Sequence, residues 1–308
     1  MPPSTLVVSL IAAPGRLDPA ALEALRGAWG GAPARWLSGG EAAEFGVAAA
    51  PANLAEVRAE MDALGVDLNL VPDNPVPDNL VPDNLVPGGG RRKRLLLADM
   101  DGTMIGQECI DELADLAGVG PEVAAITERA MRGEVDFEGA LEARVSLLAG
   151  LPEEAIGRVI AERLSLAPGG AALVATMRAH GARAALVSGG FTAFTAWVAA
   201  RLGFDEHRAN QLEVVDGRLT GRARRPYLGR EAKVAALEEI AGRMGIGAGD
   251  VLAVGDGAND LGMIERAGMG VALRAKPVVA ERAPFRVRHG DLSALLYLQG
   301  YARADFAA

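Results

Sequence analysis

Two aspartates at the end of a short apolar run are the first residues in this chain whose types and spacing could do chemistry. Residues 95–98 are continuously apolar, which is typical of a buried strand in a parallel sheet. Asp99 and Asp101 follow, and Gly102 allows a tight turn after them. Two carboxylates this close raise one another's pKa unless a cation lies between them, and oxygen ligands of this kind suit Mg²⁺. A turn built from Asp, Gly and Thr is the alternative interpretation.

A second apolar run ends in the same manner. Residues 251–255 precede Asp256, and Asn259 and Asp260 follow at the start of an expected helix. Ligands gather beyond the carboxyl ends of the strands in open α/β sheets, so Asp256 is expected to approach the same cation as Asp99 if the two strands are neighbours. Asn259 and Asp260 are also suited to cap the helix.

Two further segments are suited to bind an anion. The expected strand at residues 183–187 ends in Ser188, Gly189 and a second glycine, before a helix that starts near residue 191. Backbone N–H groups at such a helix start favour negative charge, and Ser188 adds a hydroxyl donor. Lys233 lies near the start of another expected helix, where the dipole prefers anions, so this lysine makes sense if it faces a bound phosphate. A plain turn and a surface lysine are the alternatives.

The composition narrows the class of protein. The chain has 308 residues, half of them hydrophobic, and its net charge of −9 argues against a nucleic-acid partner. Its one cysteine, Cys109, excludes an intramolecular disulfide. No apolar run approaches the ~18 residues that span a bilayer, and the N-terminal apolar run lacks the positive lead-in of a signal peptide. We therefore expect a cytoplasmic protein without a membrane partner.

Residues 1–70 predict a small accessory domain. The order of strand, helix, strand region, helix and strand suggests a ferredoxin-like (ACT-like) α+β fold. No phosphate loop, metal cluster or catalytic pair appears in this sequence. The expected strands cover residues 6–12 and 66–71, with an irregular strand region at 34–50, and the expected helices cover 19–29 and 52–64.

Residues 71–93 predict a linker. Proline recurs every five residues in the repeat at 70–87, which forbids regular helix and a central strand, and a run of glycines follows. The basic run at residues 91–94 is expected to be solvated surface rather than a recognition patch, because it lies in an acidic protein directly before a buried strand.

Residues 94–308 predict an α/β domain. Strands and helices alternate, which indicates a mostly parallel sheet covered by helices. After the strand that ends at Asp99, about eighty residues are predicted to be helical, far more than an ordinary crossover needs. We therefore expect a helical cap at about residues 106–166, inserted after the first core strand and placed to act as a lid. Its expected helices cover residues 108–117, 121–132, 137–148 and 152–164.

Four separated motifs occur in an order that resembles the haloacid dehalogenase-like hydrolases. They are Asp-x-Asp-Gly-Thr from Asp99, Ser-Gly-Gly from Ser188, the downstream Lys233, and Gly-Asp-Gly-x-Asn-Asp around Asp256. The resemblance covers about residues 94–295. It implies a Rossmann-like core and a reaction through an aspartyl-phosphate.

The resemblance also implies roles for these residues. Asp99 attacks phosphorus, and Asp101 protonates the leaving oxygen and later deprotonates the attacking water. Mg²⁺ is expected to be held by the carboxylates of Asp99 and Asp256 and by the carbonyl of Asp101. The other expected participants are Ser188, Gly189 and Lys233, which stabilise the phosphate oxygens, Asn259, which contacts the phosphate, and Asp260, which orients Lys233 or metal-bound water.

Within this superfamily the expected cap resembles that of the phosphoserine phosphatases. In that family the residues that match Glu108 and Arg144 hold the amino and carboxyl groups of phosphoserine, and those that match Met131 and Phe137 close the pocket. An ammonium and a carboxylate on the substrate do call for an acid and a planar guanidinium. The family usually carries Ser where this chain has Gly102.

The expected activity is Mg²⁺-dependent hydrolysis of O-phospho-L-serine to L-serine and phosphate, the last step of serine biosynthesis. Two alternatives stay open. One is a related phosphatase for another small phosphate, such as phosphothreonine or homoserine phosphate. The other is a non-catalytic regulatory protein that senses an amino acid. The expected partner is a small phosphate ester, without nucleic acid or membrane, and a homodimer is left open.

Overall fold

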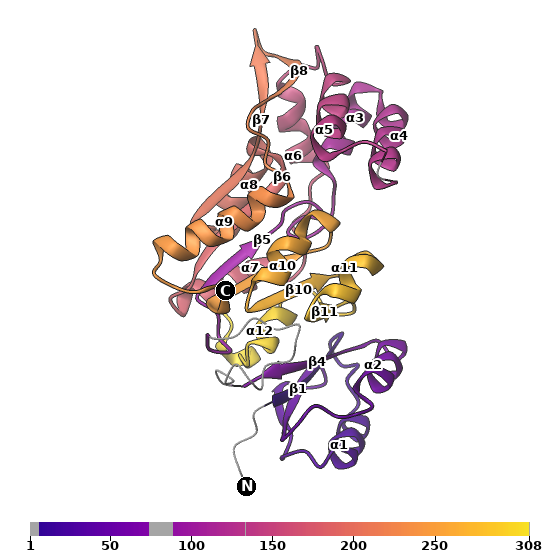
Figure 1. The fold of residues 1–308 in the computed structure, drawn as a ribbon, viewed down its shortest axis with the longest axis vertical. Coiled ribbons are helices and arrows are strands. Elements are labelled where there is room, and N and C mark those ends of the chain that lie inside the picture. The colour runs from indigo at the N-terminus through magenta and orange to yellow at the C-terminus, as the bar shows by residue number, and fades with distance from the viewer. Residues whose placement is uncertain (1–5, 74–88, 133, 308) are drawn as a thin grey trace.

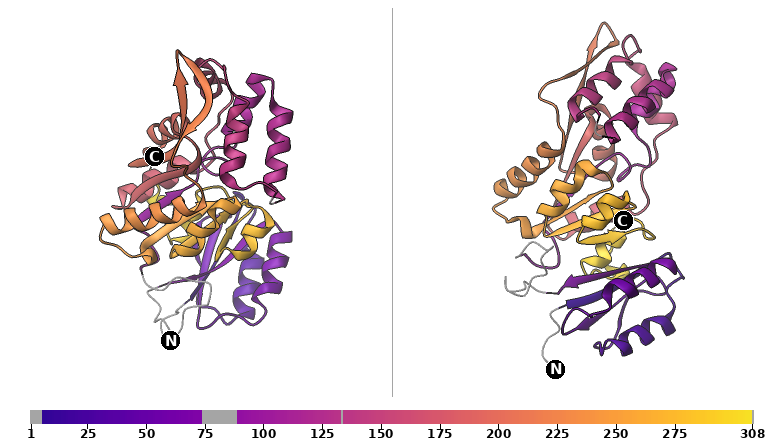
Figure 2. Two further views of the ribbon diagram at one scale, coloured as in Figure 1. Left: turned by 45° about the horizontal axis from the view of Figure 1, so that its top comes forward. Right: turned by 45° about the vertical axis from the view of Figure 1, so that its right-hand side comes forward.

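The protein consists of three parts along its long axis (Figure 1). The computed structural model describes residues 6–73, 89–132 and 134–307, so most of the expected repeat at residues 70–87 lies outside the described residues. A seven-stranded sheet with helices on both faces forms the middle, and we call this part the core. A small antiparallel sheet lies at one end of the core and a helical cap at the other (Figure 2). This architecture confirms the expected fold class.

The core sheet has β5 at its centre. The strand order is β11-β10-β9-β5-β6-β7-β8, and every neighbouring pair is parallel except the antiparallel hairpin of β7 and β8. Because β9 and β6 both lie beside β5, the residues that follow these three strands meet at one edge. The strands are β5 (Leu95–Ala98), β6 (Arg183–Phe191), β7 (Glu206–Val215), β8 (Arg218–Arg224), β9 (Val251–Gly255), β10 (Met269–Leu273) and β11 (Phe285–Val287).

Helices bury both faces of this sheet, which explains why its strands are continuously apolar. Leu96 and Ala98 pack in one cluster with α7, α8 and α12, whereas Leu95 and Leu97 pack in another with α9 and α10. None of the helices in the described ranges is long and apolar enough to cross a membrane. The core helices are α7 (Gly170–Ala179), α8 (Thr192–Leu202), α9 (Arg230–Arg243), α10 (Leu261–Arg266), α11 (Pro277–Arg282) and α12 (Ala294–Leu298), with short 3₁₀ turns at Ala248–Asp250, Ala258–Asp260 and Arg303–Asp305.

The cap consists of α3 (Cys109–Ala117), α4 (Gly120–Met131), α5 (Phe137–Ser146) and α6 (Glu154–Glu162). These four helices match the four expected ones to within a few residues. The fifth helix of the long insertion, α7, packs instead against β6 and α8 of the core.

Two short connections join the cap to the core. Ile105 and Leu166 form an antiparallel bridge, and beside it the Gln107 amide donates to the Ser165 hydroxyl and accepts the Ser165 backbone N–H. The β7–β8 hairpin also reaches the cap, where Gly150 N donates to the carbonyl oxygen of Leu219 at 2.8 Å. The cap is thus supported on two sides above the strand ends.

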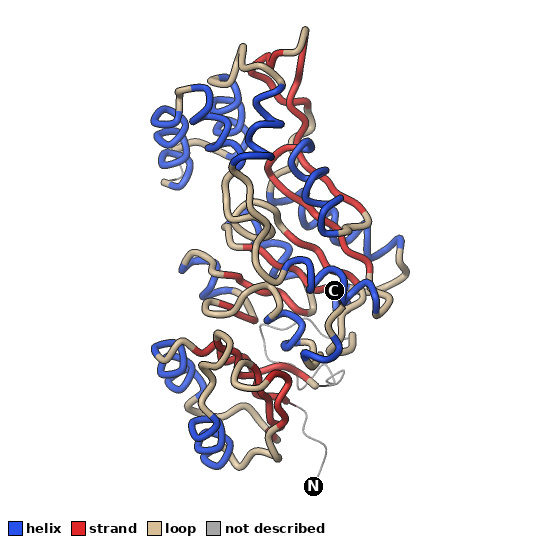
Figure 3. Tube along the Cα trace, turned by 180° about the vertical axis from the view of Figure 1, so that it is seen from behind, coloured by secondary structure: helices blue, strands red, loops and turns tan. Residues whose placement is uncertain are grey.

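The N-terminal unit, residues 6–72, is a four-stranded sheet in the order β2-β3-β1-β4. Its element order is the expected one, and Figure 3 shows both of its helices on one side of the strands. On the other side Ile11 and Val71 join the apolar cluster that contains α12 of the core. The elements are β1 (Leu6–Ala12), α1 (Pro19–Ala28), β2 (Arg35–Ser38), β3 (Ala42–Val47), α2 (Leu54–Ala63) and β4 (Val66–Pro72).

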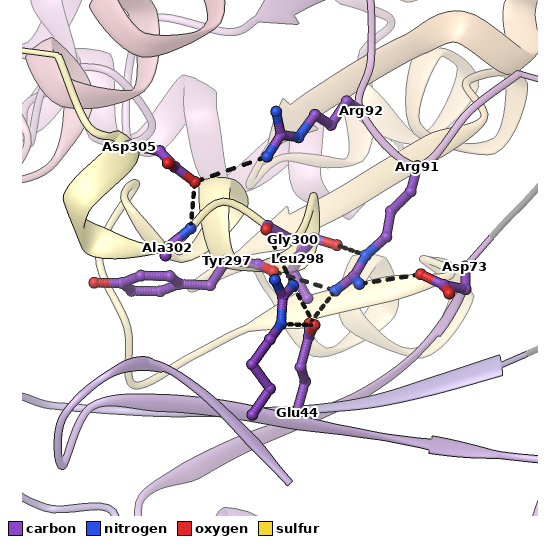
Figure 4. A network of polar contacts seen from close by, with 10 residues as sticks. Glu44, Asp73, Arg91, Arg92, Tyr297, Leu298, Gly300, Ala302 and Asp305 are labelled. Carbon is purple, nitrogen blue, oxygen red and sulfur yellow. Dashed lines mark hydrogen bonds and ion pairs between the residues drawn. The ribbon is translucent and has the colours of Figure 1, made fainter. Parts of the chain in front are cut away.

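The expectation that the basic run at residues 91–94 is solvated was wrong for two of its members. The Arg91 side chain is only 8% exposed and bonds Glu44 of β3 and the carbonyl oxygen of Leu298 (Figure 4). Lys93 is buried and donates to the carbonyl oxygen of Gly249 at 2.7 Å. Burial lowers the pKa of Lys93 to about 8, although the Asp250 charge acts in the opposite direction. The run lies between the N-terminal unit and the core, which the sequence pattern did not reveal.

Candidate active site

Three carboxylates converge beyond the carboxyl ends of β5 and β9. The two strands are direct neighbours, with Ala98 opposite Val254, so Asp99 and Asp256 emerge side by side. Carboxylate oxygens of Asp99, Asp256 and Asp260 lie within 4.8 Å of one another. The structure therefore brings together the two aspartates that the sequence assigned to one cation, and it adds Asp260.

Lys233 is buried between two of these carboxylates. Its Nζ lies 2.8 Å from Asp99 Oδ1 and 2.6 Å from Asp260 Oδ1. Burial by itself would lower the pKa of Lys233, but the Asp260 and Asp99 charges outweigh it and raise that pKa. Asp260 Oδ2 also accepts the Gly257 N–H at 3.0 Å, so the expected capping role and the expected support of Lys233 occur together.

The donor set at this edge fits a divalent cation. The three carboxylates outnumber the two lysine charges that act on them, those of Lys233 and Lys276, and burial together with the Asp260 charge raises the pKa of Asp99 well above its usual range. Burial also raises the pKa of Asp256, although the Thr103 hydroxyl donates to its Oδ1 at 2.8 Å. A divalent ion would relieve this excess of negative charge, and an all-oxygen set favours a hard ion such as Mg²⁺.

Asp101 faces another group of donors. Its Oδ1 accepts the Cys109 N–H at 3.0 Å, and its Oδ2 accepts the Ser188 hydroxyl at 3.3 Å. Burial is the main cause of the raised pKa of Asp101. This carboxylate is not part of the group formed by Asp99, Asp256 and Asp260. A raised pKa is suited to a general acid.

The Ser-Gly-Gly segment belongs to β6 rather than following it. The strand was expected to end at residue 187, but it extends to Phe191 with an irregular register. Ser188 is 1% exposed, and its Oγ accepts the Gly190 N–H at 2.8 Å. This geometry places the serine hydroxyl and the glycine backbone beside Asp101.

The expected amino-acid-binding residues come from the cap and its entry. Glu108 precedes α3 and Arg144 lies in the last turn of α5, and the two charges interact with each other and with Asp101. The Glu108 side chain is exposed to solvent on one side, and charged groups of the cap and the core lie near it. This partial desolvation, followed by the like charges of Asp101 and Asp256, raises its pKa to about 7. An acid and a guanidinium thus lie near Asp101.

The remaining expected residues have more varied positions. The Phe137 ring lies against the backbone of Gly189 and Gly229, where added Cβ atoms would lie 3.6 and 3.0 Å from it. Met131 ends α4, and its side chain is outside the described part. Asn259 lies in the 3₁₀ turn after β9 with its amide oxygen beside Gly257.

Comparison with known proteins identifies the family. The haloacid dehalogenase-like hydrolase model matches residues 96–265, more than half of the chain. The chain belongs to this family.

Curated relatives of this chain are named phosphoserine phosphatases. One from Archaeoglobus fulgidus is 43% identical over 78% of this chain and 65% of its own length. One from Streptomyces coelicolor is 45% identical over 71% of this chain and 53% of its own length. The chain therefore spans less than two thirds of the length of these relatives.

Solved structures agree in fold. A probable phosphoserine phosphatase from Vibrio cholerae, in unliganded form, superposes with a TM-score of 0.76 at 34% identity, over 98% of this chain and 88% of the other. A phosphoserine phosphatase described as a phospho-aspartyl intermediate analogue superposes with a TM-score of 0.63 at 41% identity, over 67% of this chain and 98% of the other. The first likeness includes the N-terminal unit, whereas the second covers two thirds of the chain.

Two further residues contact groups of this site, and neither had a role assigned from the sequence. Thr103 belongs to the first motif, but its position in the motif predicted no role for it. In the structure its hydroxyl donates a hydrogen bond to Asp256. Asn210 lies on β7, outside all four motifs. Its sequence neighbours do not distinguish it from other strand residues, so no local signal could have found it.

Proposed function

We propose that this protein hydrolyses O-phospho-L-serine to L-serine and phosphate, as the last step of serine biosynthesis in the cytoplasm. The observation that carries the proposal is that the charges of Glu108 and Arg144 lie close enough to interact with each other and with Asp101. A substrate that offers an ammonium, a carboxylate and a phosphate matches these charges. The names of the curated relatives support the same substrate.

Substrate binding is assigned to two sets of residues. Glu108 accepts the ammonium and Arg144 holds the carboxylate with its planar donor pair, while Phe137 and Met131 close the space above. The phosphate oxygens lie against the donors at the strand ends. These donors are Ser188, the Gly189 N–H, Lys233 and Asn259.

The covalent steps use the two aspartates of the first motif. Asp99 attacks phosphorus to form an aspartyl-phosphate, and Asp101 gives its proton to the departing serine oxygen. Asp101 then takes a proton from the water that hydrolyses the acyl-phosphate, and Asp99 is regenerated. Lys233, held by Asp260, keeps a positive charge beside the reacting groups throughout.

Mg²⁺ is the metal we assign to this edge. Asp99 and Asp256 would hold it by their carboxylates and Asp101 by its carbonyl, with Asp260 close enough to join them. When bound, the ion neutralises the excess of carboxylate charge and polarises the phosphate.

The division of the chain supports this assignment of roles. We propose an accessory domain at residues 1–70, a linker at 71–93 and a phosphatase domain at 94–308 with its cap at about 106–166. The described N-terminal unit has its own apolar cluster between sheet and helices, which is what an accessory domain requires.

The test is phosphate release with and without Mg²⁺ from phosphoserine, phosphothreonine and sugar phosphates. We expect kcat/KM for phosphoserine to exceed the others by ~100-fold, about 2.7 kcal/mol of transition-state discrimination. Equal rates across the panel would overturn the serine assignment and leave the phosphatase chemistry. If none of these substrates releases phosphate, the proposal as a whole is contradicted.

A further inference from the structure

We propose that Asn210 is the positioning residue of the phosphate-binding groups, a role that rests on the proposed phosphatase function. Asn210 is 2% exposed, and its amide makes three hydrogen bonds to main chain. Its Nδ2 donates to the carbonyl oxygens of Gly189 at 2.8 Å and Leu228 at 3.3 Å. Its Oδ1 accepts the Leu228 N–H at 2.7 Å. One side chain therefore joins two backbone segments that are far apart in the sequence.

Both segments carry groups assigned to the phosphate. Gly189 directly follows Ser188 and offers its own N–H. Leu228 directly precedes Gly229, whose carbonyl oxygen accepts the Lys233 N–H at 3.3 Å in the first turn of α9. A shift of either segment would therefore move a phosphate donor.

The β6–β7 ladder shows why a side chain is needed at this place. Val187 pairs with Arg208 and Phe191 pairs with Asn210, so residues 188–190 face a single residue of β7. Such a bulge takes backbone groups out of the ladder and re-aims side chains, commonly beside active sites. The Asn210 amide supplies one of the missing bonds, to the Gly189 carbonyl.

The cap rests on the same two segments. Phe137 lies against Gly189 and Gly229, so the surface under the ring is the one that Asn210 holds together. Asn210 thereby links the position of the phosphate donors to the seat of the cap.

An amide is the suitable group because it donates and accepts at once. An ionised Asp at position 210 would still accept the Leu228 N–H, but it would turn an oxygen toward the Gly189 carbonyl. A protonated Asp regains one donor. The Asn210→Asp variant should therefore recover as its carboxyl group takes up a proton, whereas Asn210→Ala cannot.

The control is Asn69→Ala in the full chain. Asn69 is 1% exposed and makes a matching pair of bonds to Arg286, with Nδ2 donating at 2.8 Å and Oδ1 accepting at 2.9 Å. It lies on β4 of the N-terminal unit, away from the strand ends. Its loss removes the same chemistry without touching a phosphate donor.

We expect Asn210→Ala to lower kcat/KM about 30- to 100-fold and to weaken inhibition by inorganic phosphate about 10-fold, because misplacement by an ångström has effects of this order. Asn69→Ala should keep kcat/KM and phosphate inhibition within about 3-fold of the wild-type values. Its Tm should fall about as much as that of Asn210→Ala. The rate of Asn210→Asp divided by the wild-type rate at the same pH should rise toward one as pH falls.

Equal kinetic losses in Asn210→Ala and Asn69→Ala would overturn the proposal, as would unchanged phosphate inhibition in Asn210→Ala. Should the alanine variant fail to fold, an Asn210→Asp to wild-type ratio that does not vary with pH would overturn it. If the wild type does not hydrolyse phosphoserine, the proposed function fails separately. The positioning role is then read from binding of inorganic phosphate in the presence of Mg²⁺, where Asn210→Ala must still bind more weakly than Asn69→Ala.

Discussion

Two clusters of buried charge lie at opposite ends of the core, and they are balanced differently. At the strand ends, the carboxylates of Asp99, Asp256 and Asp260 outnumber the nearby ammonium groups of Lys233 and Lys276. At the junction with the N-terminal unit, Glu44 lies between two guanidiniums, with Oε1 2.5 Å from Arg35 and Oε2 2.5 Å from Arg91. Arg91 also contacts Asp73 Oδ1 through Nη1 at 3.5 Å, and it donates to the main-chain carbonyl oxygens of Leu298 and Tyr297 (Figure 4).

The difference separates a site from a structural joint. A buried charge that its own neighbours satisfy fixes geometry, and removing one partner leaves the other charge unpaired. A buried cluster with surplus charge has its pKa values displaced and is suited to bind an ion or a substrate. We therefore expect substitutions in the first cluster to change catalysis, and substitutions in the second to change stability.

The largest effect is expected for Asp99→Asn. Loss of the nucleophile should lower kcat by at least ~10⁴-fold, which is about 5.4 kcal/mol. The free energy of unfolding without metal should not fall, because the variant removes one negative charge from a cluster with surplus negative charge. Lys233 also keeps its ion pair with Asp260. Phosphate release and thermal unfolding measure the two properties. A normal rate, or a marked loss of stability, would break the contrast between the clusters.

The second effect is expected for Glu44→Ala. Unfolding free energy should fall by about 3 kcal/mol, because the buried Arg91 loses its closest carboxylate and keeps only the longer contact with Asp73. The kcat should stay at the wild-type value, since Glu44 lies at the other end of the core. Urea unfolding and phosphate release measure both. Glu23→Ala, which removes an exposed partner of Arg26, is the control and should cost at most ~1 kcal/mol.

The third effect sharpens the assignment of the substrate end. Arg144→Ala should lower kcat/KM for phosphoserine about 100-fold, or about 2.7 kcal/mol, because a charge-assisted bidentate contact is lost. Inhibition by inorganic phosphate should be unchanged, since the phosphate donors are intact. Arg129→Ala, on the exposed side of α4 beside Glu134, should leave both constants at wild-type values. Loss of phosphate inhibition in Arg144→Ala would contradict this division of the site.

The smallest effect concerns Glu108, whose pKa is raised to about 7. A raised pKa stabilises the folded protein below about pH 4.5, and this contribution is lost as pH rises through about 7. Without Mg²⁺ and substrate, Glu108→Gln should remove that decline, as measured by urea unfolding from pH 4 to 8. Substrate binding needs the carboxylate, so the wild-type KM for phosphoserine should fall relative to that of Glu108→Gln as pH rises and Glu108 ionises. Parallel pH profiles of unfolding free energy and of KM in the wild type and Glu108→Gln would contradict this prediction.

The sequence by itself determined the parts that depend on local pattern. The continuous apolar runs before Asp99 and Asp256 indicated buried parallel strands, because only a sheet covered on both faces needs no polar alternation. The helix signals gave the cap helices to within a few residues, and the alternation of elements gave the order in the N-terminal unit. Four motifs in order were sufficient to indicate the family, which the family match confirms.

Only the tertiary structure decided which distant residues are partners. Glu44 and Arg91 bond across 47 positions, and Asn210 reaches Gly189 across 21. Such pairs leave no periodic pattern in the sequence, because each of these residues resembles any other polar residue on a strand or before one. Burial of Lys93 was missed for the same reason. Local chemistry fixes which segments form strands and helices, whereas the satisfaction of buried charges and carbonyl groups depends on how those segments pack.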